Sequence, residues 1–357
     1  MIIGFNALYL VPNGVGGTEY YLRSIIKELI NQDKNNSYII FCNKENYQTF
    51  FFEEKNIKKV LVPIAAKNKF LRIIHEYIFF PKLVEKNNCD ILYSFGYSGP
   101  FWGNFKKIIT VFDVNWKDYP EDNSLLTNFV LNFLISSSIK RSNLIITTSE
   151  FSKKRLSFYF PRYKNKMKVI WAAVDKNFIK FLKGNLKKPI KNKYILCVTA
   201  FYPHKKALYL LDLWKRFNKD NRNRIKLVII GKLGKDLKIF EQKVSKLSNI
   251  LWIKKASLKE LVSFYKHSEL VIQPSIYEGF GYPAYEALAS DKNVLVGKKD
   301  FYNDSILNYI DELSFNLDSD NELLKKSLLK KTKSRKDIYN QSYDISAKKI
   351  ISLFEEI

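Results

Sequence analysis

Two glutamates flank a glycine-rich turn in the segment Ser275–Ser290, which reads SIYEGFGYPAYEALAS. Glu278 stands before Gly279 and Gly281, and Glu286 lies about one turn into the helix that Pro283 is suited to begin. Backbone amides at a helix start favour phosphate, and carboxylates accept paired hydrogen bonds from vicinal sugar hydroxyls. The segment therefore predicts a nucleotide-sugar site. The alternative is a surface loop before an ordinary helix with an exposed Glu286.

A second glycine-rich loop, PNGVGGTEYY, spans Pro12–Tyr21 near the start of the chain. Gly16 and Gly17 let the backbone approach a ligand closely, and the helix that follows presents amides to an anion. The sequence lacks both a G-x-G-x-x-G pattern and a G-K-[ST] ending. A plain glycine turn before a helix capped by Thr18 remains open.

Two further side chains follow apolar, strand-like runs. Asp113, in TVFDVNW, is placed to hold a sugar hydroxyl or orient a substrate, although a capping role is equally open. Lys205, in TAFYPHKKALYLL, suits a leaving diphosphate because lysine is a mobile point charge. The alternative for Lys205 is a basic side chain on a solvated turn.

Short apolar runs alternate with amphipathic stretches along the chain, which predicts parallel sheets covered on both faces. The pattern restarts after Lys193, so we expect an α/β protein with two doubly wound domains, 1–180 and 181–340. A linker is expected over Phe178–Lys193, and residues 341–357 form an amphipathic closing helix expected to pack back on the first domain. Ligands bind at the carboxyl ends of such strands, so the cleft between two such domains is the expected site. The predicted strands are Ile2–Leu10, Tyr38–Cys42, Val60–Val62, Ile91–Ser94, Ile108–Phe112, Leu144–Thr147, Val169–Trp171, Tyr194–Ala200, Lys226–Gly231, Ile250–Ile253, Leu270–Pro274 and Asn293–Gly297.

The chain is strongly basic, with a formal net charge of +25 over 357 residues. Compositional drift and an anionic partner explain this charge equally well. The stretch Ser152–Lys168 interleaves cations with aromatic residues, so it is a candidate for contact with an anionic bilayer, against a solvated helix face. No helix-turn-helix, zinc-finger or RNP-like motif is found, so no specific nucleic acid is expected.

The number of cysteines and the lengths of the apolar runs indicate the cellular compartment. Cys42, Cys89 and Cys197 form no C-x-x-C motif, which suits a reducing compartment and argues against a disulfide framework or a zinc site. No signal peptide is visible, and no apolar run reaches the length of a membrane span. We expect a cytoplasmic protein, with peripheral contact at the inner face of the cell membrane.

An ordered set of motifs resembles retaining glycosyltransferase family 4. PSIYEGFGYPAYEALAS resembles that family's E-x7-E signature, and GVGGTEYYLRSIIKEL, TTSEFSKKRL, VIWAAVDKNF, VTAFYPHKKAL and LVIIGKLG match further motifs in order and spacing. The similarity covers nearly the whole chain. It implies the GT-B fold, in which two Rossmann-like domains face a cleft.

The resemblance also implies roles for individual residues. Glu286 would bind the donor ribose, Glu278 the hydroxyls of the transferred sugar, and Lys205 the departing diphosphate. The amides of Gly279, Phe280 and Gly281 would contact sugar and diphosphate. The loop at Gly16 and Gly17 would close the cleft from the other domain. No metal or other cofactor is implied, because lysine and amides take the place of a divalent ion.

Phe112 departs from the family pattern, since many relatives have histidine before the aspartate that corresponds to Asp113. Phenylalanine can neither exchange a proton nor accept a hydrogen bond, and His204 stands where relatives carry arginine. The resemblance implies transfer of a hexose from a nucleoside-diphosphate sugar to a lipid-linked or growing saccharide, in surface polysaccharide or lipopolysaccharide synthesis. GDP-mannose is slightly favoured over a UDP-sugar. The alternatives are a nucleotide-sugar epimerase, a sugar phosphorylase, or an inactive sugar-nucleotide-binding partner.

Overall fold

The computed structural model describes residues 1–12, 14, 16–220, 225–331 and 342–357. Asn13 and Val15, which belong to the predicted glycine loop, lie outside these residues. The chain forms two compact units. Unit 1 comprises Met1–Val114, Leu126–Ala173 and Gln341–Ile357, and unit 2 comprises Asn115–Leu125 and Val174–Asn340. The sequence places all of residues 1–180 in the first domain; in the structure, Asn115–Leu125 and the residues from Val174 onward belong to unit 2.

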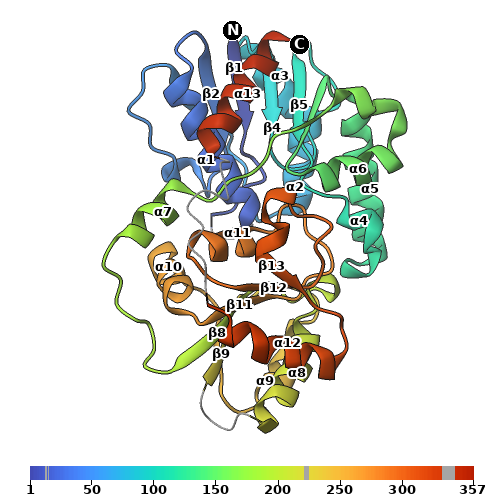
Figure 1. Ribbon diagram of the computed structural model, residues 1–357. Coiled ribbons are helices and arrows are strands. Elements are labelled where there is room, and N and C mark those ends of the chain that lie inside the picture. The colour runs from blue at the N-terminus through green and yellow to red at the C-terminus, as the bar shows by residue number, and fades with distance from the viewer. Residues whose placement is uncertain (13, 15, 221–224, 332–341) are drawn as a thin grey trace. The chain divides into compact units, whose positions relative to one another are not determined.

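Unit 1 is built on a seven-stranded parallel sheet in the order β3-β2-β1-β4-β5-β6-β7 (Figure 1). The order reverses between β1 and β4, which is the position where open α/β sheets bind ligands at the strand ends. Its strands are β1 (Ile2–Asn6), β2 (Ser37–Cys42), β3 (Ile57–Leu61), β4 (Ile91–Ser94), β5 (Lys106–Thr110), β6 (Leu144–Thr147) and β7 (Met167–Val169).

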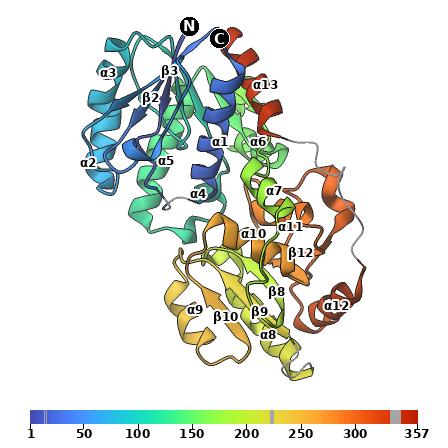
Figure 2. The ribbon, with the colours of Figure 1, turned by 90° about the vertical axis from the view of Figure 1, so that its left-hand side faces the viewer.

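Alternate side chains of this sheet point to opposite faces and pack in two separate cores. Phe41 points to one face, where its ring packs 5.0 Å from Phe80 of α3 (Phe80–Lys86). Tyr38 points to the other face and stacks on Phe5 at 5.1 Å. Figure 2 shows the helices α1 (Gly17–Gln32) and α13 (Tyr343–Glu355) side by side on one side of the sheet, with α2 (Lys69–Ile74) and α3 on the other. Unit 1 also contains the π-helix η2 (His75–Phe79), most of α5 (Leu125–Arg141) and α6 (Glu150–Tyr159).

The closing helix α13 belongs to unit 1, although it follows unit 2 in the sequence. Tyr343 packs edge-on against Tyr21 of α1 with ring centroids 6.1 Å apart. Ser346 donates a hydrogen bond of 2.7 Å to the carbonyl of Trp171. Burial of the apolar face of α13 thus completes the layer over the sheet of unit 1.

Unit 2 has a six-stranded parallel sheet in the order β10-β9-β8-β11-β12-β13, with the reversal between β8 and β11. Two doubly wound α/β sheets were predicted, and both are found. The strands are β8 (Lys193–Val198), β9 (Ile225–Ile230), β10 (Ile250–Ile253), β11 (Leu270–Gln273), β12 (Val294–Val296) and β13 (Ile310–Glu312). The helices of this unit are α4 (Asn115–Asp118), α7 (Lys176–Lys183), α8 (Ala207–Asp220), α9 (Leu237–Val244), α10 (Leu258–His267), α11 (Tyr282–Ala289) and α12 (Leu317–Leu329).

Helices cover both faces of the second sheet. Trp214 of α8, Phe240 of α9 and Leu324 of α12 pack in one core with the strand residues Cys197 and Ile272. On the opposite face, the ring of Tyr194 lies 5.9 Å from Phe264 of α10. The helix α11 packs against β11 and β12.

Several predicted segments differ from the structure. The strand β3 begins three residues before the predicted Val60–Val62, β7 ends where the predicted Val169–Trp171 begins, and β13 was not predicted. The first strand ends at Asn6 rather than Leu10, because the Asn6 side chain turns the chain by accepting a hydrogen bond from the amide of Leu8 at 3.0 Å. The predicted linker Phe178–Lys193 is wrong over its first six residues, which belong to α7. Asp175 caps that helix, and Phe178 is fully buried against Tyr265.

The three cysteines are buried and form no disulfide with one another. Burial raises the pKa of the Cys42 thiol to about 12, so it remains protonated and behaves as a small core side chain. Within the described part of the chain, no helix combines the length and hydrophobicity that crossing a bilayer requires.

Candidate functional site

Lys205 and Glu278 meet at the carboxyl edge of the second sheet. The Lys205 Nζ lies 2.7 Å from Glu278 Oε2, and the two side chains are only 18% and 12% exposed. Lys205 follows β8 and Glu278 follows β11, the two strands on either side of the reversal in strand order. The amide of Ile276 donates a hydrogen bond of 2.9 Å to the carbonyl of His204, which ties the two loops together. The sheet order therefore brings these two predicted residues together.

A chain of hydrogen bonds fixes the Glu278 carboxylate from its other side. Gln273 Nε2 donates to Glu278 Oε1 at 2.7 Å, and Tyr302 donates to Gln273 Oε1 at 3.0 Å. Burial is the largest single influence on the pKa of Glu278 and raises it, but the adjacent Lys205 ammonium, together with His204 and Ser275, outweighs burial and holds the pKa below its usual value. Glu278 is thus an oriented, ionised acceptor. Sequence reasoning missed Gln273 and Tyr302; a polar residue ending the apolar strand LVIQP was the available signal for Gln273.

The glycines after Glu278 shape the start of α11. Gly281 is the N-cap of this helix and has a φ of 81°, which a residue with a side chain rarely adopts. A Cβ at this position would lie 2.6 Å from the Tyr302 ring. The backbone of Gly281 therefore packs closely on the aromatic ring and directs the chain into the helix. The N-terminus of α11 is a position that favours a negative charge.

Glu286 has quite different surroundings, inside α11. Its exposure is 8%, so it is not the exposed helix residue of the alternative interpretation. Burial raises its pKa to about 7; Tyr265 lowers the pKa and the negative charge of Asp175 raises it further. Near neutral pH this carboxyl group gains or loses its proton readily. A ligand whose hydroxyls donate to the carboxylate would stabilise the ionised form.

His204, which precedes Lys205, is a buried structural residue. Its Nδ1 pairs with the carboxylate of Asp122, which is buried as well. The ring of Tyr119 lies 5.7 Å from the histidine ring. The pair anchors the segment Asn115–Leu125 to the loop after β8 and fixes the position from which Lys205 extends. Asp122 carried no sequence signal, because it lies 82 residues from His204.

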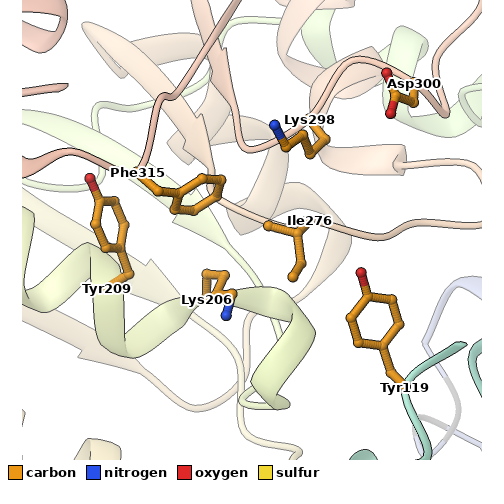
Figure 3. Close-up of a pocket in the computed structure, with 7 residues that line it drawn as sticks. All are labelled: Tyr119, Lys206, Tyr209, Ile276, Lys298, Asp300 and Phe315. Carbon is orange, nitrogen blue, oxygen red and sulfur yellow. The ribbon is translucent and has the colours of Figure 1, made fainter. Parts of the chain in front are cut away.

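A pocket of about 580 Å³ lies next to these loops within unit 2 (Figure 3). In Figure 3, Lys206 and Tyr209 extend from the start of α8, and the Tyr119 ring faces them from another segment. Ammonium groups can bind phosphate and aromatic faces can stack on a sugar ring, so the lining suits a phosphorylated carbohydrate. The full lining is Tyr119, Lys206, Tyr209, Ile276, Lys298, Asp300 and Phe315.

The remaining predicted residues belong to unit 1. Asp113 follows β5 and accepts a hydrogen bond of 3.1 Å from the Tyr97 hydroxyl, which comes from the loop after the neighbouring strand β4. Gly16 is the N-cap of α1 with a φ of 59°, and Gly17 is the first residue of that helix. Both glycines are exposed.

Phe112 contributes to the core of unit 1. Its exposure is 7%, and its ring packs edge-on against Tyr21 at 5.2 Å. The position before Asp113 therefore stabilises the packing of α1 on the sheet.

As for metals, the described residues contain no group of three or more histidine, cysteine, aspartate or glutamate side chains placed to hold an ion.

Comparisons with known proteins agree with this architecture. Residues 15–178 match the family model Glycosyltransferase Family 4, and residues 178–344 match Glycosyl transferases group 1. The chain is 25% identical over 317 residues to the O-antigen chain mannosyltransferase RfbU of Salmonella typhimurium, covering 85% of this chain and 84% of that protein.

Two solved structures share the fold. The crystal structure of WaaG, a glycosyltransferase involved in lipopolysaccharide biosynthesis, matches with a TM-score of 0.71 at 14% identity, covering 98% of this chain and 99% of that one. Sucrose-phosphate synthase from Thermosynechococcus elongatus matches with a TM-score of 0.73 at 14% identity, covering 100% of this chain and 98% of that one. These likenesses confirm the predicted GT-B fold.

Proposed function

Because the chain belongs to the glycosyltransferases of family 4 and group 1, we propose that it is a retaining hexosyltransferase that uses a nucleoside-diphosphate sugar. The observation that carries the proposal is the arrangement of Lys205, Glu278 and Gln273 at the N-terminus of α11. It combines a cation for phosphate with an oriented carboxylate for sugar hydroxyls. Similarity to a mannosyltransferase makes GDP-mannose the favoured donor, with a UDP-sugar next.

We assign donor contacts to unit 2. Glu286 accepts hydrogen bonds from the ribose, Glu278 accepts them from the transferred sugar, and the amides of Gly279, Phe280 and Gly281 face sugar and diphosphate. Lys205 neutralises the diphosphate as it leaves. In unit 1, Asp113 orients the acceptor, and the loop at Gly16 and Gly17 contributes to the donor. No metal is required, because Lys205 and the amides supply the positive charge.

The ion pair of Lys205 with Glu278 also supports a role in catalysis. A bound diphosphate competes for the ammonium, so the charge stabilising the leaving group is already in place before bond cleavage. As the bond from the anomeric carbon to the diphosphate breaks, a departing phosphate oxygen accepts the proton of the acceptor hydroxyl. The hydroxyl oxygen bonds to the anomeric carbon on the same face of the sugar, which retains the anomeric configuration. No protein nucleophile takes part in this mechanism.

The acceptor we propose is a lipid-linked or growing saccharide in the synthesis of a surface polysaccharide or lipopolysaccharide. Similarity to an O-antigen mannosyltransferase supports this class of product. We place the reaction in the cytoplasm at the inner face of the cell membrane, with the basic chain in peripheral contact with anionic lipid.

The test is a thermal-shift panel with UDP, GDP, ADP and CDP, followed by assays of donor hydrolysis. The cognate nucleotide should raise the melting temperature in proportion to RT ln(1 + [L]/Kd), and Glu286→Ala should abolish that rise. Glu278→Gln should keep nucleotide binding and lose turnover. The matched control is Glu322→Gln, which alters a 70% exposed carboxylate on α12.

Stabilisation by none of the four nucleotides would refute the donor site. Nucleotide binding without transfer or hydrolysis would identify an inactive sugar-nucleotide-binding partner. Product analysis separates the remaining enzymes: an interconverted donor sugar indicates an epimerase, and a sugar 1-phosphate formed from free phosphate indicates a phosphorylase.

A further inference from the structure

Unit 1 exposes large apolar side chains on two helical segments that line the same groove. On α5, Leu126, Phe129 and Phe133 are 74%, 71% and 57% exposed. Their spacing of three and four residues places them on one face of the helix. On α2 and η2, the exposed apolar side chains are Phe70 at 72%, Leu71 at 56%, Ile78 at 53% and Phe79 at 57%. Exposed apolar clusters of this kind mark interaction sites.

Aromatic contacts join the two segments into one surface. The ring of Tyr77 in η2 lies 4.3 Å from Phe101, and Phe101 lies 6.0 Å from Phe133 of α5. A groove of about 600 Å³ runs between the segments. Trp102, which is 39% exposed, lines this groove and donates a hydrogen bond of 2.9 Å to the carbonyl of Tyr77.

The charges on this surface are positive. Lys82 is the charged residue that lines the groove, and Lys69 is exposed at the start of α2. The acid of that segment, Glu76, is 5% exposed and turned inward, where it accepts a hydrogen bond of 2.7 Å from Asn6. The helix α5 has no acidic residue and ends in Lys140 and Arg141.

We propose that this surface, formed by α2, η2 and α5, docks the protein on an anionic phospholipid bilayer. The inference rests on the proposed function, in which the acceptor is carried by a membrane lipid. Aromatic and leucine side chains insert at the level of the headgroups while flanking lysines bind anionic lipid. A second copy of the chain fits less well, because self-association would bring like charges together.

This assignment moves the membrane contact away from the stretch Ser152–Lys168, which was the candidate from the sequence. There, Leu156 and Met167 are 1% exposed and belong to the core, while Phe158, 70% exposed, is the exposed large apolar residue of that fully described stretch. The stretch is basic but offers little apolar area for insertion.

Vesicle sedimentation with the full-length protein tests the proposal. The vesicles contain equal amounts of phosphatidylglycerol and phosphatidylcholine, and pure phosphatidylcholine serves as the uncharged comparison. We expect Phe129→Ser/Phe133→Ser to lower the partition coefficient about tenfold or more, because two large apolar side chains no longer insert. Phe158→Ser is the matched control and should leave partitioning within about twofold. Added salt should weaken the binding of the wild-type protein.

Loss of binding in Phe158→Ser with retention in Phe129→Ser/Phe133→Ser would overturn the assignment, as would failure of the wild-type protein to bind the anionic vesicles. Sedimentation velocity showing a dimer that the double variant dissociates would also overturn it, in favour of self-association. The nucleotide-induced thermal shift of the same proteins reports on the donor site independently. A preserved shift without vesicle binding defeats this inference alone, whereas vesicle binding without any shift defeats the proposed function.

Discussion

The buried carboxyl group of Glu286 makes the free energy of unfolding depend on pH. In the folded protein its pKa is raised to about 7 from an ordinary value of 4.5, chiefly by burial. Between these two values the folded protein holds a proton that the unfolded chain has released. The stabilisation that this proton provides is complete below the lower value and is lost as the pH rises through the higher one.

The two pKa values set the size of the effect. At about 1.4 kcal/mol for each pH unit, the gap corresponds to on the order of 3 kcal/mol of unfolding free energy. The isosteric change Glu286→Gln removes the ionisation. We therefore expect the variant to gain stability relative to the wild-type protein, by up to that amount, between about pH 5 and about pH 8.

Urea unfolding of both proteins across this range measures the difference. The gain in stability is expected for Glu286→Gln and not for a change at Glu278. The pKa of Glu278 is lowered in the folded protein, so losing its charge should reduce the free energy of unfolding above the acid range. Glu322→Gln, on an exposed carboxylate, should follow the wild-type curve at every pH. Parallel stability curves for Glu286→Gln and the wild-type protein would show that the carboxyl group is not buried as described.

Four further predictions follow from the same structure. Lys205→Met should cut turnover by at least about a hundredfold and, by leaving Glu278 without its cation, destabilise the fold by up to about 3–5 kcal/mol, measured by steady-state assay and urea unfolding. Gly281→Ala should cost about 1–3 kcal/mol, because its φ of 81° and the Tyr302 ring both oppose a side chain; unchanged stability would contradict the described turn. Phe112→His should lower stability by about 1–3 kcal/mol through lost packing in unit 1, and a gain in turnover would show that this position also serves the reaction. A chelator should leave donor turnover unchanged, whereas a loss restored by Mg²⁺ would contradict the proposed role of Lys205 and the amides.

Most strands of this chain could be predicted from the sequence, because they depend on the hydrophobicity of neighbouring residues. Apolar runs predicted most strands, and Leu144–Thr147 and Ile91–Ser94 were placed at their observed limits. Segments whose ends depend on particular side chains were missed. The strand after Met1 stops at Asn6 because of an amide turn, and Asp175 begins a helix within the expected linker.

The sequence by itself determined the class of protein, because the family's motifs follow one another along the chain, and it predicted a donor segment from the amides, carboxylates and cation of two loops. Only the tertiary structure decided what those residues contact. Lys205 meets Glu278 because β8 and β11 are neighbours in the sheet, and Asp122 reaches His204 across 82 residues of sequence. Burial likewise sets the pKa of Glu286 and leaves the aromatic face of α5 exposed. Sheet order and burial depend on how the whole chain packs, and no local pattern specifies them.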